Sequence, residues 1–89
     1  MKVYDKAAWH IDGGENKDAV LKKMGIVLAY LAKHNMLTDE GKEILDMGID
    51  SSISLHERMV NKDGQEFLES EYDSLLKLSE SEIQKKLNG

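Results

Sequence analysis

The sequence predicts a small all-α domain, a bundle of four to five helices in which an extended N-terminal segment covers one end. The 89 residues include no proline, and apolar residues recur with the 3.6-residue period of helices. A chain of this length fits one domain with a single core. We therefore expect one helical domain over 1–89, with 1–15 as the N-terminal cap segment and 16–89 as the helical bundle.

The clearest helix is predicted over 17–34, because its apolar residues form one continuous stripe. These residues are Val20, Met24, Val27, Leu28 and Leu31. Asn35 can adopt the left-handed conformation that ends a helix. We expect this helix to be central and the most buried.

A second helix is predicted over 38–47. Thr38 is a good N-cap residue, and Gly48 ends the segment. Ser54 and Glu57 match the capping-box pattern Ser-x-x-Glu, which predicts a short helix over 54–61.

The last clear helix is predicted over 65–78, after a turn at "NKDG". Phe67, Leu68, Tyr72, Leu75 and Leu76 would share one face of it. Ser79-Glu-Ser-Glu82 is a further capping-box pattern, so the chain either continues as helix through Ser79 or breaks there.

Composition limits the compartment and the partners. The chain has no cysteine, so disulfides and thiolate metal sites are excluded, and a reducing cytoplasm suits it. The segment "MKVYDKAAW" lacks the apolar run of a secretion signal, and the longest uncharged run, 24–32, is too short for a membrane span. A net charge of −5 opposes binding to nucleic acid. We expect a cytoplasmic protein without a nucleic-acid or membrane partner, and we predict no oligomeric state.

The stretch "YDKAAWHIDGG" holds the residues most suited to a site. In one interpretation Trp9, the only tryptophan, plugs the core against the central helix, and His10 is hydrogen-bonded nearby. In the other, His10, Asp12 and Glu15 converge with Asp5 on a ligand or a divalent cation, or act in acid/base chemistry. Trp9 would then belong to the ligand-binding set. The pattern His-x-Asp is common by chance, so both interpretations stay open.

These residues also carry a resemblance. "YDKAAWH", a glycine-containing turn, "MGIVLAYLAKHNML" and "SLHERMVNKDGQEFLESEYDSLL" together resemble an uncharacterised bacterial family of small domains that begin with a Tyr-Asp-x-Ala-x-Trp-His pattern. The resemblance spans residues 4–78. The chain departs from the family at Lys23, where histidine is common, and at Tyr30, where tryptophan is common. The resemblance supports a domain of this kind and implies no reaction.

The C-terminal third is acidic. From Asp63 to Glu82 there are seven acidic residues and one basic residue, Lys77. Such a face either aids solubility or docks a basic protein surface. Small acidic proteins that neutralise basic toxins use the second principle, which suggests an immunity-like role by analogy. The candidate partner-binding residues are Glu66, Glu69, Glu71 and Asp73.

Enzymatic chemistry is not indicated. The sequence contains no nucleophile elbow, no phosphate-binding glycine loop, no catalytic cysteine and no His-Glu-x-x-His pair. We therefore expect a protein-binding or regulatory module that is not an enzyme and has no cofactor. The alternative is a small ligand- or metal-binding domain centred on His10.

Overall fold

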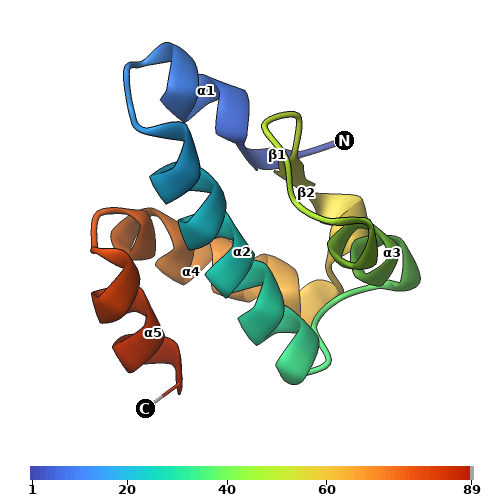
Figure 1. Cartoon of the computed structure of the whole chain (residues 1–89). Coiled ribbons are helices and arrows are strands. Elements are labelled where there is room, and N and C mark those ends of the chain that lie inside the picture. The colour runs from blue at the N-terminus through green and yellow to red at the C-terminus, as the bar shows by residue number, and fades with distance from the viewer. Residues whose placement is uncertain (89) are drawn as a thin grey trace.

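The computed structural model describes residues 1–88, which form a mainly helical domain with a small sheet (Figure 1). In chain order the elements are β1 (Val3–Lys6), α1 (Ala7–Asp12), α2 (Lys17–Lys33), α3 (Asp39–Met47), β2 (Ser54–His56), the short 3-10 helix η1 (Glu57–Met59), α4 (Lys62–Leu76) and α5 (Glu80–Asn88). Helix α2 crosses the middle of the fold, with α5 on one side and α3 and the strands on the other (Figure 1). The prediction of a mainly helical domain is confirmed, but the domain is not a pure helical bundle.

The central position of α2 is confirmed. Its five predicted stripe residues are buried, and four of them, Met24, Val27, Leu28 and Leu31, have no exposed surface. The Asn16 side chain caps the helix by accepting a hydrogen bond from the Ala19 N–H at 3.0 Å. None of the helices within residues 1–88 combines the length and apolar composition that a membrane span requires.

The predicted end of α2 and both predicted ends of α3 are confirmed. Asn35 has a φ of 58° and follows the end of α2. Thr38 Oγ1 accepts a hydrogen bond from the Gly41 N–H at 3.2 Å and so caps α3. Gly48, with a φ of 96°, ends α3.

The predicted helix over 54–61 is wrong. Residues Ser54–His56 form strand β2, which pairs antiparallel with β1. Within 54–61 the only helical residues are the three of η1. Burial alternates along this segment. Ile53 and Leu55 are buried, whereas Ser54 and His56 are half-buried. That two-residue period is typical of a strand. The Ser-x-x-Glu pattern did not produce a helix, because strand β1 pairs with the backbone groups of this segment that a helical turn would otherwise have used.

The N-terminal segment also differs from the prediction. It is not an extended cap, because strand β1 leads directly into the short helix α1. The Ala7 N–H at the start of α1 donates a hydrogen bond to the Ile53 carbonyl at 3.0 Å, which ties α1 to the chain just before β2.

The C-terminal region consists of two helices. Helix α4 begins earlier than predicted, because Asn61 caps it by accepting a hydrogen bond from the Gly64 N–H at 3.0 Å, so "NKDG" is not a turn. The chain breaks at Ser79, one of the two outcomes left open by the sequence. The Ser79 N–H donates to Glu82 Oε1 at 3.1 Å, and the Glu82 N–H donates to Ser79 Oγ at 3.3 Å. This reciprocal capping box starts α5.

Truncation of Leu28 tests the central position of α2. We expect Leu28→Ala to lower the free energy of unfolding by about 2–5 kcal/mol, because the side chain is fully buried and its removal leaves a cavity. Met47→Ala is the matched control, since Met47 is 80% exposed, and it should cost less than about 0.5 kcal/mol. Urea denaturation followed by circular dichroism measures both values. Equal losses in the two variants would contradict the assignment of α2 as the core helix.

Candidate functional site

A buried carboxylate is the centre of the candidate site. Strand β1 directs Asp5 inward, and Asp5 is only 4% exposed. Its carboxylate accepts hydrogen bonds from the Lys6 N–H at 2.8 Å and from the Tyr72 hydroxyl at 2.6 Å. His10 Nε2 lies 2.8 Å from both carboxylate oxygens. Because burying an unpaired charge is costly, these partners explain how the carboxylate is tolerated inside the fold.

His10 lies between two carboxylates. Its Nε2 contacts Asp5, and its Nδ1 lies 2.7 Å from Glu15 Oε2. The turn after α1 brings Glu15 back to His10, and the Glu15 N–H donates to the His10 carbonyl at 3.0 Å. Ionised carboxylates only accept hydrogen bonds, so an imidazole with a proton on each nitrogen would satisfy both of them. Burial opposes this charge, but the hydrogen bonds and charges of Asp5 and Glu15 outweigh it and raise the pKa of His10.

Tyr72 connects the N-terminal segment to α4. It is 67 positions away from Asp5 in the sequence, is buried, and donates its hydroxyl hydrogen to Asp5 Oδ2. Burial, together with the neighbouring Asp5 carboxylate, raises the pKa of Tyr72 far above its usual range. The phenol therefore remains a hydrogen-bond donor throughout the pH range in which the protein is handled. In the following text, Asp5, His10, Glu15 and Tyr72 are called the Asp5 cluster.

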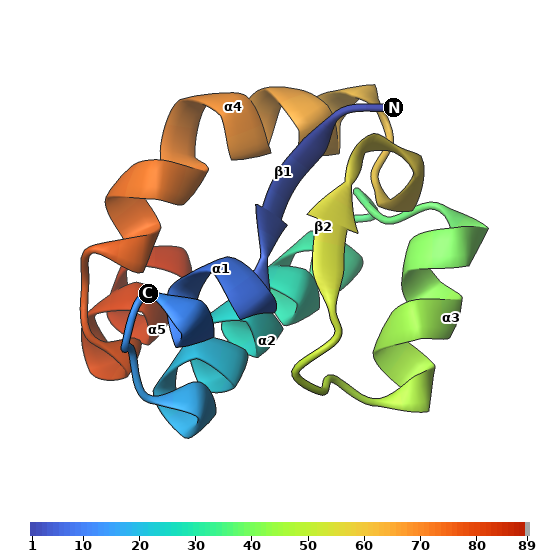
Figure 2. The same cartoon turned by 90° about the horizontal axis from the view of Figure 1, so that it is seen from above.

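A groove of about 740 Å³ opens beside the Asp5 cluster. Figure 2 shows the elements that contribute to it, with α4 running past β1 and α1. The groove is lined by Tyr4, Asp5, Trp9, His10, Glu15, Lys23, Tyr72, Asp73, Leu76 and Lys77. Lys23 reaches the end of α4, where its Nζ donates to the Leu76 carbonyl at 3.4 Å. The groove therefore combines an aromatic rim with charged groups of both signs.

The prediction that Trp9 plugs the core is wrong. The side chain is 54% exposed and lines the groove. The reason is the unexpected helix α1, in which Ala7, His10 and Ile11 occupy the inner face and are buried or half-buried. Trp9 therefore points outward from the same helix, where Lys6 Nζ lies 5.9 Å from the centre of its ring.

The structure brings together three of the four polar residues that were predicted to converge. Asp5, His10 and Glu15 meet, whereas Asp12 is exposed at the end of α1. Within residues 1–88 no three histidine, aspartate or glutamate side chains have an arrangement that could hold a metal ion. Both His10 nitrogens already face carboxylates, so neither offers a lone pair to a cation or to a substrate proton. The metal-binding interpretation is not supported by this geometry.

Sequence reasoning missed the contribution of α4 to this site. Tyr72 was correctly predicted to lie on an apolar core face of the helix. Its hydroxyl group, however, donates to Asp5, which lies at the other end of the chain. Lys23, Asp73 and Lys77 also line the groove without any local pattern that marks them as site residues. Only the packing of α4 beside β1 and α1 reveals the full set.

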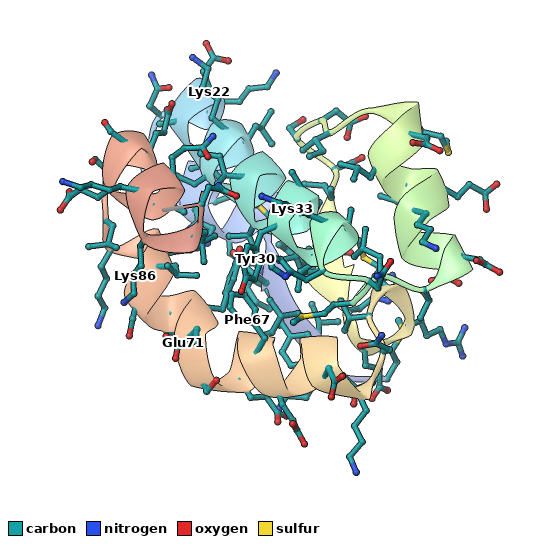
Figure 3. The ribbon with its side chains drawn as sticks, turned by 90° about the horizontal axis from the view of Figure 1, so that it is seen from below. Lys22, Tyr30, Lys33, Phe67, Glu71 and Lys86 are labelled. Carbon is teal, nitrogen blue, oxygen red and sulfur yellow. The ribbon has the colours of Figure 1, made fainter. Side chains whose placement is uncertain are left out.

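The predicted partner-binding residues do not form one face. Glu66, Glu69 and Asp73 are exposed and follow the i, i+3, i+7 spacing of one helical stripe on α4, called here the acidic stripe. Lys2 reaches this stripe, and its Nζ lies 2.6 Å from Glu69 Oε1. Glu71 lies on another side of α4, on the face where Phe67 packs against Tyr30 (Figure 3).

Comparisons with family models, with curated proteins and with solved structures found no match to the chain. The resemblance to the Tyr-Asp-x-Ala-x-Trp-His family stays a prediction. Only the geometry of the site itself therefore indicates a function.

Removal of the Tyr72 hydroxyl tests the Asp5 cluster. We expect Tyr72→Phe to lower the free energy of unfolding by about 1.5–3 kcal/mol, because the buried Asp5 carboxylate loses a hydrogen bond. Tyr30→Phe is the matched control, since Tyr30 is half-buried and packs by its ring on Phe67. That change should cost less than about 0.5 kcal/mol. Chemical denaturation compares the variants, and a loss in Tyr72→Phe no larger than in the control would contradict this role.

The His10 interactions predict a pH-dependent stability. The pKa of His10 is raised in the folded protein, so its stabilising effect is fully present below the unfolded pKa of about 6.5 and is lost as the pH rises through the folded value. The free energy of unfolding should therefore be larger at about pH 6 than at about pH 9. His10→Gln should reduce that difference. A difference that is the same in the wild type and the variant would show that other groups cause it.

Proposed function

We propose that the protein is a small protein-binding module that engages a basic partner through Trp9 and the acidic stripe. The observation that carries the proposal is the exposure of Trp9 at the rim of the groove, with 54% of its surface accessible. Tryptophan is enriched among the residues that dominate binding energy at protein interfaces. An exposed single tryptophan beside a hollow supplies an anchor of this kind.

The acidic stripe supplies the charge for such an interface. Glu66 and Asp73 are exposed on α4, and Glu69 lies between them. The whole chain carries a net charge of −5, which favours the approach of basic proteins. Carboxylates at the edge of an interface mainly accelerate association and select partners by charge. Lys2 and Lys77 lie beside the stripe and offset part of its negative charge.

Trp9 and the acidic stripe lie on one continuous surface. Asp73 lines the groove together with Trp9, and it also lines an adjoining hollow together with Glu69 and Tyr4. A partner segment that covers the groove would therefore meet the indole and two carboxylates in sequence along its length. This continuity supports one binding surface composed of α1 and α4.

The Asp5 cluster would hold this surface in its binding conformation. Helix α1 has six residues, too few to be stable alone in water. The contact of His10 with Asp5 and the link from Asp5 to Tyr72 hold α1 against α4. A preorganised anchor loses less conformational entropy on binding. By analogy with small acidic proteins that neutralise basic toxins, a cytoplasmic protein with such a surface would act by covering the basic surface of its partner.

A second candidate function is the binding of a small molecule in the same groove, centred on His10. The observation in its favour is the combination of a sizeable groove with aromatic and charged groups from β1, α1, α2 and α4. Isothermal titration with a small-molecule panel distinguishes it from the first candidate, because a groove ligand would bind without dependence on Glu66, which lies outside the groove.

Charge reversal tests the proposed interface. We expect the double variant Glu66→Lys/Asp73→Lys to slow association with an octa-arginine peptide by about tenfold at low salt. The control Glu43→Lys/Asp46→Lys reverses two exposed carboxylates on α3 and changes the net charge equally. Stopped-flow fluorescence of Trp9, the only tryptophan, measures the rates.

The control decides the interpretation. Slower association in the α4 variant alone supports a localised surface on α4. Equal slowing in both variants would show that net charge, and no particular surface, governs the encounter. No change in Trp9 emission on peptide binding would contradict the role of Trp9 as anchor.

A further inference from the structure

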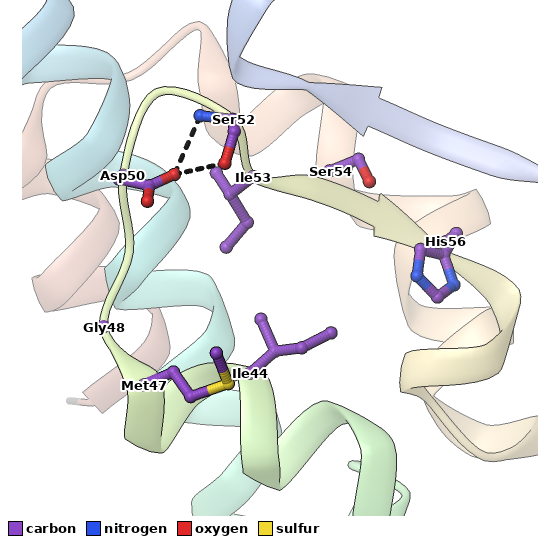
Figure 4. Close-up of a pocket in the computed structure, with 8 residues that line it drawn as sticks. All are labelled: Ile44, Met47, Gly48, Asp50, Ser52, Ile53, Ser54 and His56. Carbon is purple, nitrogen blue, oxygen red and sulfur yellow. Dashed lines mark hydrogen bonds between the residues drawn. The ribbon is translucent and has the colours of Figure 1, made fainter.

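Another hollow lies on the far side of the small sheet, between α3 and β2. Its volume is about 240 Å³. Figure 4 shows the residues that line it: Ile44, Met47, Gly48, Asp50, Ser52, Ile53, Ser54 and His56. None of these residues lines the groove beside Trp9.

Backbone contacts fix the helix that forms one wall of the hollow. The Thr38 N–H donates to the Met59 carbonyl at 2.9 Å, and Thr38 Oγ1 donates to the Arg58 carbonyl at 2.6 Å. A Cβ atom on Gly41 would lie only 2.1 Å from the Met59 carbonyl oxygen, so α3 approaches η1 as closely as glycine permits. The first half of α3 is therefore locked on η1. Its second half, with Ile44 and Met47, faces the start of β2 across the hollow.

His56 lies at one end of this hollow, and its side chain makes no hydrogen bond within residues 1–88. Its side chain is only 14% exposed, and its Nδ1 is buried without a partner. Its Nε2 lies 3.6 Å from Glu40 Oε2, which is beyond hydrogen-bond distance. Buried polar groups nearly always have a hydrogen-bond partner, so an imidazole in this state is a candidate for an interaction with a bound molecule.

The charges around the hollow limit what can bind. Hydrogen bonds from the Ser52 hydroxyl and backbone lower the pKa of Asp50, so this carboxylate is ionised at one end. Glu40 lies near His56 at the other end. An anionic ligand would be repelled from both ends. Between them, Ile44, Met47 and Ile53 offer apolar contact, and Met47 is 80% exposed at the mouth.

We propose that this hollow binds a small molecule that has a compact apolar body and one neutral hydroxyl group. The hydroxyl group forms a hydrogen bond with the imidazole of His56, and the apolar body contacts Ile44, Ile53 and Met47. The Ser54 hydroxyl, which also lines the hollow, is a second polar contact. The proposal is independent of the protein-binding surface, because the two sites share no residue.

Three probes of similar size and different charge test the proposal on the intact wild-type protein. We expect benzyl alcohol to shift the methyl NMR signals of Ile44, Met47 and Ile53, with a dissociation constant of about 1 mM, as is usual for so few atoms. Benzoate should bind at least about tenfold more weakly, because its carboxylate faces Asp50 and Glu40. Benzylamine is attracted by the same two carboxylates but must lose the hydration of its ammonium group, so we expect it to bind no more tightly than the alcohol.

Variants locate the hydrogen bond. His56→Phe keeps an aromatic ring and removes both nitrogens, so it should weaken benzyl alcohol binding by about threefold to tenfold. Ser54→Ala, a smaller change, serves if the first variant does not fold, and it should weaken binding in the same direction. Trp9→Ala is the control and should leave the affinity unchanged, since Trp9 lines the other groove.

The same data can overturn the proposal. Methyl shifts confined to residues beside Trp9 would place the probe in the wrong site. Tighter binding of benzoate or benzylamine would exclude a neutral hydroxyl ligand. Full affinity in both His56→Phe and Ser54→Ala would exclude a hydrogen bond to either side chain, and an absence of methyl shifts with all three probes would show that the hollow binds no such molecule.

Discussion

The buried carboxylate of Asp5 is the interaction on which the arrangement of the N-terminal half depends. A carboxylate with 4% exposure is tolerated only when hydrogen-bond donors surround it. Its donors come from β1, α1 and α4, through the Lys6 N–H, His10 and Tyr72. These elements cannot separate without leaving a charge unpaired in the interior. The carboxylate therefore specifies where α1 and α4 lie relative to the strand, beyond what apolar packing requires.

The orientation of Trp9 follows from this constraint. Helix α1 has six residues and depends on tertiary contacts for its stability. Its inner face is used by Ala7 and by His10, which is held between Asp5 and Glu15. The indole has no place on that face and points to the solvent. The exposed aromatic side chain is thus a consequence of the buried charge, and the two together account for the surface to which we assign partner binding.

The small size of the sheet accounts for the groove beside Trp9 and for the hollow between α3 and β2. A two-stranded sheet has one unpaired edge on each strand and is marginally stable without covering elements. Helix α4 lies beside β1 and helix α3 lies beside β2, but neither can replace a third strand (Figure 2). The groove is lined by Tyr4 and Asp5 of β1, and the hollow by Ser54 and His56 of β2. Polar side chains of the strands thus face cavities on either side of the sheet.

The sequence by itself determined the features that depend on neighbouring residues. The apolar stripe of α2, the Asn35 stop, the Thr38 cap and the capping box at Ser79 all act within a few positions, so their patterns are local. Tertiary structure decided the features that join distant segments. The segment at Ser54 became a strand because β1, about fifty residues earlier, offered backbone partners. Asp5 and Glu15 were correctly grouped with His10 from their spacing, yet Tyr72 joined them only through the packing of α4, and Trp9 turned outward only because α1 formed. The physical reason is that a local pattern states which conformations a segment can adopt, whereas the burial of one charge among distant elements selects between them.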